Sequence, residues 1–424
     1  MTVSQEIADM IVSPMAHAER DALDAAFAQL RKEAPLTKIQ PKGYHPFWAV
    51  TKFNDILEIE RNNEVFHNGG DFSAVILDIE TVNNIKALTG GRSTPVHHMT
   101  EMDGKEHIDH RFLTQKYLMP VSLKKLEERI SEMAADAIEN MASLGGECNF
   151  TKDVAFLYPL RVIMELLGVP PEDEPMMLKL TQEFLGSTDP DMNGGIQDIP
   201  PEQQVEIFKE VMVSMKAYFQ KITDDRRVNP REDIASVIAN GVINGEPIGY
   251  DEAMSYYILV ATAGHDTTSN SLASSMWQLA ENPDQFKLLK ENPSLIPSFI
   301  EESLRWETPV RSFMRNAVED CVVSGQQIKK GDLLMLCFPS ANRDEDIYDE
   351  PFKFNIQRPK TKHLAFGHGV HLCLGQHLGR LEMRVFWEQL LPRLESVEIS
   401  GDTSRVIANF VSGPKSLPIR YKMT

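Results

Sequence analysis

One cysteine set between glycines near the C-terminus constrains this chain more than any other feature. Segment 366–375 reads F-G-H-G-V-H-L-C-L-G, and helical periodicity begins at Leu374. Gly367 and Gly369 permit backbone conformations that other residues avoid, so the chain can turn tightly and a flat molecule can approach it. Unpaired N–H groups and the helix dipole stabilise a thiolate placed just before a helix. These features make Cys373 a candidate axial metal ligand.

Histidines crowd the same segment and leave a second interpretation open. His363, His368, His371 and His377 lie close to Cys373 in the sequence. Imidazole and thiolate together also bind zinc, and residues four apart on a helix share a face. However, the segment contains no C-x-x-C or H-x-x-x-H pair, so a tetrahedral site would require the loop and the helix to converge. Zinc is therefore the weaker interpretation.

Composition excludes several classes of protein. The 424 residues carry 62 acidic and 43 basic side chains, a net charge of −19, which disfavours binding to nucleic acid. No apolar run approaches the roughly 18 residues of a membrane span, and no signal peptide is recognisable at the N-terminus. The four cysteines are widely separated, as is typical of reduced thiols. We therefore expect a cytoplasmic protein that does not bind membranes.

Periodicity predicts a mainly α fold with a small β region. Helical patterns cover 21–32, 122–144, 153–167, 202–227, 251–280, 296–306 and 374–394. Short apolar or alternating runs predict strands at 47–51, 321–323, 333–338 and 394–399. Segments 69–99 and 187–201 contain glycine, proline and polar residues, and we expect both to be irregular. In the first of them, Gly90, Gly91 and Pro95 should break any helix near 81–88.

The predicted helix around Ala261 contains residues that stability alone would not select. It reads A-T-A-G-H-D-T-T over 261–268, and Gly264, Asp266 and Thr267 are poor formers of a helix interior. Glycine leaves room beside the helix, while Asp and Thr side chains compete for backbone hydrogen bonds and can open a local bulge. A hydrolase triad built on His265 and Asp266 is disfavoured, because adjacent helical residues point in different directions and no G-x-S-x-G elbow accompanies them.

The spacing F-x-x-G-x-x-x-C-x-G resembles the haem-binding signature of the cytochrome P450 family. Motifs in the same order as in that family cover almost the whole chain, from D-G-K-E-H-I-D-H-R at 103–111 to Cys373. The resemblance implies the cytochrome P450 fold, a large helical domain with a small β-rich subdomain. We expect a single domain over 1–424, with β-rich parts at roughly 36–66 and 307–340 and a haem loop at 366–375.

The resemblance implies the cofactor and the residues that hold it. The cofactor is haem b, and Cys373 is the ligand of its iron. In the family's pattern, the propionates are contacted by His107, Arg111, Arg315 and His371. The remaining cofactor-binding residues implied are Phe366, Gly367, Gly375, Ala263 and Gly264. Gly104 and Lys105 stand where the family has a proline pair, which alters the local turn but not the His-to-Arg spacing.

The resemblance also implies roles in chemistry and in support of the haem loop. A-G-x-D-T-T resembles the oxygen-activation motif, in which Thr267 contacts dioxygen and Asp266 relays protons from solvent. Glu302 and Arg305 form an E-x-x-R pair that, with Arg358, resembles the family's buried structural network. As an isolated helix pair, E-x-x-R is more often surface decoration worth less than about 1 kcal/mol.

The implied activity is monooxygenation of a small hydrophobic molecule. Segments 172–186, 311–315 and 409–415 look similar to the subgroup that includes the alpha-terpineol hydroxylase. This similarity suggests a cyclic monoterpenoid or alkyl-aromatic substrate. In the family's topology, loops 69–99 and 187–201 cover the substrate. The implied pocket residues are Ile76, Leu77, Leu185, Leu259, Ala263, Val310, Phe313 and Phe410, and each has packing in the core as its alternative role.

Electrons must come from a separate protein, because the chain contains no convincing flavin or nicotinamide fingerprint. We expect a ferredoxin-type iron–sulfur donor with its reductase, and a monomeric enzyme. The cations expected near the thiolate side, as a basic island for an acidic donor, are Lys116, Lys360, Lys362, Arg380 and Arg384. The alternative function is a haem-binding sensor or carrier without oxidation activity, which would have no use for the relay at Asp266 and Thr267.

Overall fold

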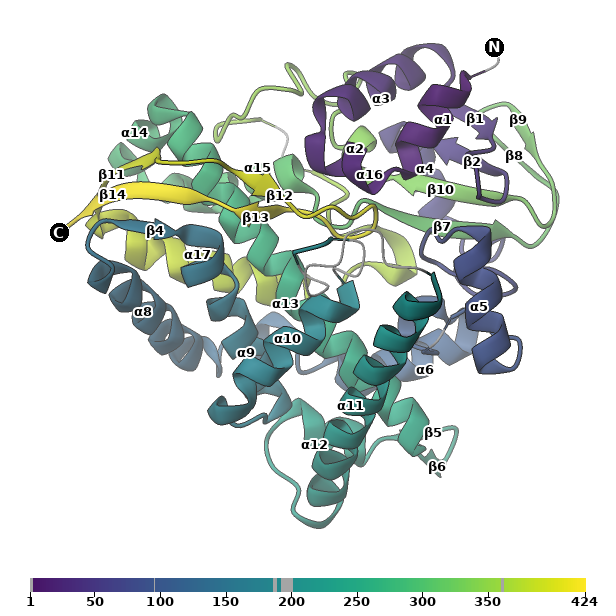
Figure 1. Cartoon of the computed structure of the whole chain (residues 1–424), viewed down its shortest axis with the longest axis horizontal. Coiled ribbons are helices and arrows are strands. Elements are labelled where there is room, and N and C mark those ends of the chain that lie inside the picture. The colour runs from purple at the N-terminus through teal and green to yellow at the C-terminus, as the bar shows by residue number, and fades with distance from the viewer. Residues whose placement is uncertain (1–2, 95, 186–188, 192–200, 360–361) are drawn as a thin grey trace.

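Helices dominate the fold and surround one long central helix, α13 (Figure 1). The structure is a computed structural model that describes residues 3–94, 96–185, 189–191, 201–359 and 362–424. Its α-helices are α1 (Gln5–Val12), α2 (Pro14–Glu19), α3 (Asp21–Glu33), α4 (Phe53–Arg61), α5 (Ile79–Thr89), α6 (Gly104–Gln115), α7 (Pro120–Leu123), α8 (Glu127–Ser143), α9 (Leu157–Leu167), α10 (Glu174–Leu185), α11 (Pro201–Val228), α12 (Ile234–Ala239), α13 (Tyr250–Glu281), α14 (Pro283–Glu291), α15 (Ile296–Glu307), α16 (Phe338–Ala341) and α17 (Gln376–Arg393).

The strands form a five-stranded sheet, a three-stranded sheet and short two-stranded ribbons. The larger sheet has the order β1-β2-β10-β7-β3, and β10 pairs parallel with β2 and antiparallel with β7. The three-stranded sheet has the order β11-β14-β4. The bounds are β1 (Leu36–Ile39), β2 (Phe47–Val50), β3 (Phe66–His67), β4 (Glu147–Asn149), β5 (Val242–Ile243), β6 (Glu246–Pro247), β7 (Ser312–Ala317), β8 (Cys321–Val323), β9 (Gln326–Ile328), β10 (Leu333–Cys337), β11 (Leu394–Ile399), β12 (Ser404–Arg405), β13 (Pro414–Ser416) and β14 (Pro418–Met423).

Side-chain alternation explains how the larger sheet is buried on both faces. Leu334 and Leu336 of β10 pack in one apolar cluster with α4, whereas Leu333 and Met335 pack in another with α1 and α3. Successive side chains of a strand point to opposite faces, so a strand buried on both sides is apolar throughout. The helical part has its own large core, which α8, α9, α13 and α17 share. In Figure 1 the sheet and the N-terminal helices lie at one end of the molecule, and the helical part occupies the rest.

The predicted fold class is confirmed, and most of the predicted helices and strands agree closely with the observed ones. Strands 321–323 and 394–399 have the predicted bounds, and α13 exceeds its prediction by one residue at each end. Helix 122–144 divides into α7 and α8, and the start of 153–167 belongs to a π-helical turn over Thr151–Ala155.

The expectation of an irregular segment at 69–99 was wrong in part, because α5 forms within it. Asp78 caps this helix by accepting a hydrogen bond from the Thr81 amide, and Gly90 ends it in the left-handed conformation at φ +71°. The glycine pair that was expected to break a helix near 81–88 therefore does end one. Most of the other expected loop, 187–201, lies outside the described residues.

Candidate functional site

A cavity between α13 and segment 366–375 gathers most of the predicted site residues. Its empty volume is about 1540 Å³, which includes space open to solvent. The wall from α13 includes Leu259, Ala263, Gly264 and Thr267, and the opposite wall includes Cys373. Motifs more than a hundred residues apart thus face a common space. All the predicted cofactor-binding residues line it: His107, Arg111, Ala263, Gly264, Arg315, Phe366, Gly367, His371, Cys373 and Gly375.

The loop that carries Cys373 is shaped by its glycines. Gly367 and Gly369 have φ values of +65° and +69°, and a side chain on Gly369 would place its Cβ 2.0 Å from the carbonyl oxygen of Glu60. The backbone of α4 therefore packs directly on this loop, which only glycine allows. The Cys373 amide donates to the Phe366 carbonyl at 2.9 Å, and this bond closes the turn around the sulfur.

Cys373 is partly buried, and its surroundings act on the pKa of its thiol in opposite directions. Burial raises its pKa above the ordinary value, whereas the backbone N–H groups of Gly375 and Gln376 act in the opposite direction. The expected stabilisation by the helix start is therefore present but does not outweigh burial. A thiol in this setting would ionise when a metal cation replaces its proton.

One end of the cavity collects donors for negatively charged groups. The rings of His107 and His371 lie 4.1 Å apart, and Arg111 donates to the carbonyl oxygen of Leu372 at 2.6 Å. Arg315 is 4% exposed and reaches the carboxylate of Glu60 at 3.4 Å. His107 Nε2 is buried and has no hydrogen-bond partner within the described part of the chain. A buried, unpartnered ring nitrogen that can carry a proton, beside guanidinium groups, fits the propionates of haem.

The residues present thus fit a haem group. The sulfur of Cys373 lines the cavity, apolar walls flank it, and donors for the propionates gather at one end. The competing zinc interpretation gains no support. In the residues that the structure describes, no three His, Cys, Asp or Glu side chains converge as metal ligands. Instead, His363 lies 3.2 Å from Glu301, and His368 accepts from Arg61 at 3.3 Å.

Helix α13 runs without interruption through the A-T-A-G-H-D-T-T motif, so the suggested bulge does not form. The hydroxyl groups of Thr262 and Thr267 donate to carbonyl oxygens one turn earlier, at 2.7 and 2.8 Å. At Gly264 the missing side chain makes room for Ile163 of α9, whose Cδ1 would lie 2.4 Å from a Cβ added at this position. Asp266 is buried at 6% exposure, and its Oδ1 lies 3.5 Å from Nδ1 of His265.

Of the seven predicted pocket residues whose side chains the structure describes, four line the cavity, namely Leu259, Ala263, Val310 and Phe313. Phe410 packs behind Phe313, with ring centroids 5.5 Å apart. Ile76 lies instead in the apolar cluster on the N-terminal face of the sheet, and Leu77 is half-buried away from the cavity lining. Leu185 ends α10, beside the part of the chain that is not described.

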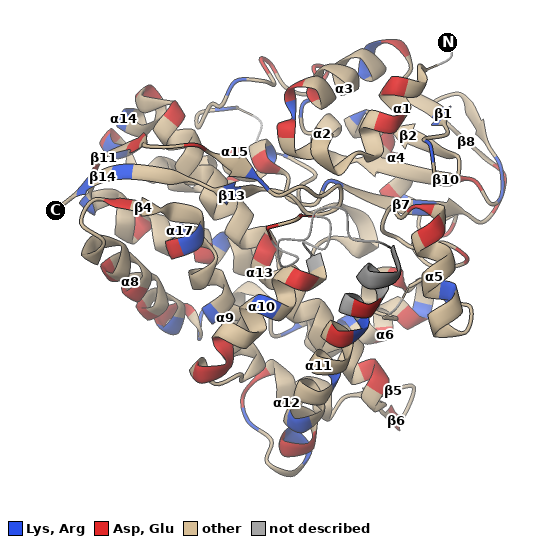
Figure 2. Cartoon of the chain, viewed as in Figure 1, with Lys and Arg blue, Asp and Glu red and all other residues tan. Residues whose placement is uncertain are grey.

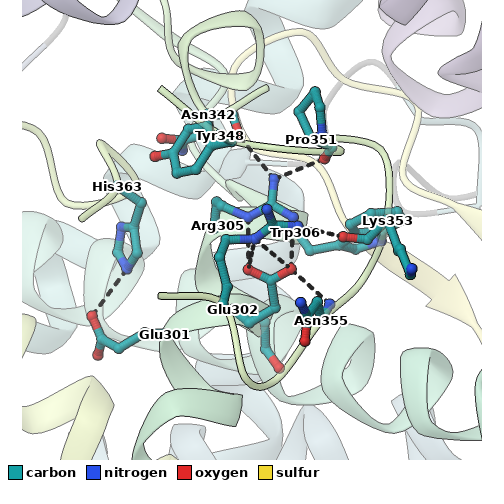
Figure 3. Close-up of polar contacts among 12 residues, drawn as sticks. Glu301, Glu302, Arg305, Trp306, Asn342, Tyr348, Pro351, Lys353, Asn355 and His363 are labelled. Carbon is teal, nitrogen blue, oxygen red and sulfur yellow. Dashed lines mark hydrogen bonds and ion pairs between the residues drawn. The ribbon is translucent and has the colours of Figure 1, made fainter. Parts of the chain in front are cut away.

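The predicted pair of Glu302 and Arg305 is buried, not surface decoration (Figure 3). Arg305 donates to both carboxylate oxygens of Glu302, at 2.7 and 2.8 Å, and Arg358 reaches the same carboxylate at 3.1 Å. Arg305 also donates to the carbonyl oxygen of Asn342 at 2.8 Å, and the Asn342 side chain accepts from the Leu364 amide at 2.7 Å. The network therefore connects α15 to the segment that precedes the Cys373 loop.

Sequence reasoning missed two acidic residues that line the cavity. Glu60 lies in a helix that no motif marked, and burial raises its pKa to about 7 against the effect of Arg315. Glu382 is fully buried in α17, and neither carboxylate oxygen has a partner among the described residues. A sequence signal existed for Glu382, since it interrupts the apolar face of the 374–394 pattern.

Comparison with known proteins decides the family. The profile described as Cytochrome P450 matches residues 79–421. This chain belongs to the cytochrome P450 family. It is 41% identical over 421 residues to Cytochrome P450-terp of Pseudomonas sp, covering 99% of this chain and 98% of that protein. Linalool 8-monooxygenase of Pseudomonas putida is 30% identical and is covered to 94%, with 93% of this chain aligned.

Solved structures of other cytochromes P450 share the fold. CYP108D1 from Novosphingobium aromaticivorans superposes with a TM-score of 0.92 and 40% identity, covering 100% of both chains. Mycobacterium marinum CYP268A2, solved in complex with pseudoionone, gives a TM-score of 0.86 at 26% identity, covering 96% of this chain and 97% of that one. The predicted family and the monooxygenase class of enzyme are therefore confirmed, and membership implies a haem-thiolate cofactor. Within the described part of this cytochrome P450, every helix is too short or too polar to cross a bilayer.

Proposed function

We propose that this cytochrome P450 hydroxylates a small hydrophobic substrate, a cyclic monoterpenoid or an alkyl-aromatic, with dioxygen and two electrons from a ferredoxin. The observation that carries the proposal is the shared cavity, which Cys373 lines from one wall and Thr267 from the other. We place the protein in the cytoplasm as a monomer, as its composition and family suggest.

The cofactor in this proposal is haem b. Cys373 would hold its iron, and His107, Arg111, Arg315 and His371 would receive its propionates. When bound, a thiolate-ligated haem supplies activation of dioxygen. Ala263 presents only a methyl group on the α13 side of the cavity, and Gly264 has no side chain, so this side leaves space for the cofactor and substrate.

Thr267 and Asp266 are proposed to control protons on the α13 side of the cavity. Thr267 donates its hydroxyl proton to the Ala263 carbonyl at 2.8 Å, so its oxygen is free to accept a hydrogen bond from a group in the cavity. Asp266 precedes it by one position and is buried, which raises the pKa of its carboxyl group. A raised pKa brings a carboxyl group closer to the range in which it can act as a general acid.

The wall chemistry and the relatives support the substrate class. Leu259, Val310 and Phe313 present apolar surface to the cavity, and Phe410 backs Phe313. An apolar wall selects hydrophobic molecules by burial and places few hydrogen-bond requirements on them. Two curated relatives, Cytochrome P450-terp and linalool 8-monooxygenase, have names that point to terpenoids.

A ligand screen tests the proposal. Small terpenes and alkyl-aromatics are titrated into the ferric protein, and displacement of water from the iron is followed in the visible spectrum. Molecules that bind are then tested for oxidation with a surrogate ferredoxin and reductase. We expect at least one cyclic terpenoid or alkyl-aromatic to be hydroxylated. A thiolate-type carbon monoxide spectrum without oxidation of any of them would favour the sensor or carrier.

Replacement of the sulfur tests the cofactor assignment. Cys373→Ser should abolish the thiolate-type carbon monoxide spectrum and substrate oxidation, because serine is a poor ligand for this iron. Cys321→Ser is the matched control, since that thiol lies in a surface ribbon of β8 and β9. Retained oxidation in the Cys373 variant would contradict the assignment.

Two of the four described cations expected to attract the ferredoxin, Arg380 and Arg384, are paired with carboxylates, whereas Lys116 and Lys362 are exposed. Arg380 lies 2.6 Å from Glu301, and Arg384 lies 2.9 Å from Glu388. Burial opposes ionisation of Glu301, but hydrogen bonds from His363 and Arg380 lower its pKa to about 2. Figure 2 shows basic and acidic residues interspersed over the chain. Lys360 lies outside the described residues.

We therefore propose that exposed apolar side chains, as well as cations, contact the ferredoxin when it docks. Val121 of α7 is 84% exposed and Phe112 of α6 is 66% exposed. Arg380 and Arg384 line a surface cavity together with Pro120 and Leu123 of α7, with an empty volume of about 1250 Å³ that includes space open to solvent. Val121→Asp should weaken electron transfer from the ferredoxin more than Arg384→Gln does, as measured by the rate of haem reduction. Equal rates in wild type and Val121→Asp would contradict this part of the proposal.

A further inference from the structure

Glu60 of α4 places a buried carboxyl group at the end of the cavity where the propionates are proposed to bind. The residue lines the cavity and is 5% exposed. Its Oε1 lies 3.4 Å from Nη2 of Arg315, whereas Oε2 is buried and has no hydrogen-bond partner in the described chain. The Glu60 carbonyl is also the group that packs on Gly369, so α4 is held directly against the haem loop. An ionised carboxylate in this position would have one oxygen that is shielded from both water and donors.

Charged groups from several elements surround Glu60 and its partner Arg315. The guanidinium group of Arg315 in β7 is also acted on by Asp103 and by Glu101 of the 3₁₀ turn Met99–Glu101. Of the other elements packed on α4, α16 has only uncharged side chains, and β8 contributes the Cys321 thiol. The remaining titratable or charged side chains at this end are Arg61, His67, His107, Arg111, His368 and His371.

Carboxyl groups outnumber guanidinium groups at this end of the cavity. The carboxyl groups are those of Glu60, Glu101 and Asp103, and the guanidinium groups that line the cavity are those of Arg111 and Arg315. Burial lowers the pKa of His107 to about 3 and also lowers that of His371, so neither ring adds positive charge at neutral pH. Two propionates would increase the excess of negative charge. Like charges in a poorly solvated site raise the pKa of one another, which favours uptake of a proton by one of the carboxyl groups.

Glu60 is the carboxyl group best suited to hold that proton. Burial opposes ionisation of Asp103, but contacts with His371 and two backbone amides lower its pKa overall. Burial raises the pKa of both Glu60 and Glu101 to about 7. However, both oxygens of Glu101 accept from the Ala74 amide, at 3.2 and 3.0 Å, and Glu101 lies outside the cavity lining. Glu60 has an unpartnered oxygen and lies beside the space that a propionate would enter.

We propose that Glu60 is a positioning residue for haem, which as a neutral acid leaves the charge of Arg315 to a propionate and as a carboxylate competes for it. This inference rests on the proposed function, in which Arg315 receives a propionate. Above neutral pH, binding of haem is then coupled to uptake of one proton by Glu60 from water, which reaches the cavity through its open part. When the pH rises further, Glu60 loses this proton, neutralises Arg315 and repels the propionate. Haem is therefore held less tightly as the pH rises.

Transfer of haem from the ferric holoenzyme to an excess of an apoprotein acceptor, followed in the visible spectrum from pH 6 to pH 9, tests the coupling. Glu60→Gln keeps the shape of the side chain and stays neutral at every pH. We expect both proteins to lose haem at similar rates at pH 6. At pH 9 wild type should lose it about tenfold faster than the variant, since one linked proton changes an equilibrium constant by up to about tenfold per pH unit. Other titrating groups, Cys373 among them, act in both proteins, so the ratio of the two rates isolates Glu60.

Two control variants separate Glu60 from its surroundings. Glu101→Gln removes a neighbouring buried carboxyl group that also acts on Arg315, and it should keep the wild-type rise of the rate with pH. His97→Gln removes a titratable ring that is 42% exposed and lies 2.9 Å from Glu106, and it should have no effect. Loss of the pH effect in Glu101→Gln would assign the proton to Glu101 and overturn the inference.

Infrared spectra of the ferrous carbon monoxide form of the holoenzyme observe the proton directly. We expect a carboxylic acid band at pH 6 that is lost at pH 9 in wild type and is absent from Glu60→Gln. If that variant does not bind haem, Glu60→Asp assigns the band by its shift, because aspartate keeps the carboxyl group. The absence of a band from Glu60 at pH 6 would overturn the inference.

The outcomes separate the inference from the function on which it rests. Faster haem loss from Glu60→Gln than from wild type at every pH would show that Glu60 holds Arg315 as an ionised partner, and the inference would fail. A ratio of the two rates that does not change with pH would also overturn it. If Arg315→Gln loses haem faster than wild type while that ratio stays constant, the propionate assignment stands and only the inference fails. If Arg315→Gln retains haem as wild type does, both fail.

Discussion

The ring of His107 in α6 lies 4.1 Å from the ring of His371 in the loop before Cys373, with an angle of 36° between the planes. Burial, reinforced by His371 and Arg111, lowers the pKa of His107 to about 3. The ring is therefore neutral at physiological pH and acts as a hydrogen-bond donor without a charge. Its Nε2 atom is buried without a partner among the described residues, and haem propionate, to which a protonated Nε2 would donate, is its proposed partner.

Removal of this donor should loosen the cofactor. His107→Phe keeps the ring and its packing on His371 but loses the N–H group. We expect the rate of haem loss to an acceptor protein to rise about tenfold, because a hydrogen bond to a charged group contributes about 1.5–3 kcal/mol. His97→Gln serves as the control. An unchanged rate in His107→Phe would show that its Nε2 does not bind the cofactor.

Gly369→Ala should prevent the haem loop from closing. The added Cβ would meet the Glu60 carbonyl at 2.0 Å, and the residue has a φ of +69°. Gly43 has a similar φ of +83° with no atom within 4 Å of such a Cβ, so Gly43→Ala measures the backbone cost alone. That cost is about 1–2 kcal/mol. We expect Gly369→Ala to be less stable than Gly43→Ala and to purify with little haem. Equal unfolding midpoints and haem contents would contradict the close approach.

Glu302→Gln should destabilise the fold by about 3–5 kcal/mol, because it leaves two buried guanidinium groups without their carboxylate. The guanidinium groups are those of Arg305 and Arg358, both within 3.1 Å of Glu302. Glu132→Gln removes an exposed partner of Arg129 and should cost less than about 1 kcal/mol. Denaturant unfolding measures both changes. A loss of similar size in the two variants would mean that the buried network does not support the loop.

Because of Glu382, we expect the free energy of unfolding to fall as the pH rises. Burial raises its folded-state pKa well above the ordinary value, so the folded chain holds a proton that the unfolded chain releases above about pH 4.3. Stability from this group is full below that pH and is lost as the pH rises toward the folded-state pKa. Glu382→Gln cannot titrate, so its unfolding free energy should fall less between pH 5 and pH 8. Parallel pH profiles for the two proteins would count against a neutral buried carboxyl group.

Sequence patterns predicted the helices and strands well, because the spacing of apolar residues depends on the backbone geometry within one element. The helical spacing of apolar residues gave α13 and α17, and the spacing around Cys373 gave the haem loop and the family. One sequence pattern led to a prediction that was wrong in part, for segment 69–99. The glycines at 90 and 91 suggested an irregular segment, yet the cap at Asp78 starts a helix before them.

The amino-acid sequence determined the family and the helical class, and it singled out Cys373 as the proposed iron ligand, because these depend on residue types at short, fixed spacings. The tertiary structure decided which distant side chains meet. It placed His107 against His371, buried Ile76 in the apolar core and paired Arg380 with Glu301. It also brought Thr181 and Phe156 to the ring of His265. Such contacts join separate elements through packing, and spacing along one chain does not encode the direction in which a packed side chain points.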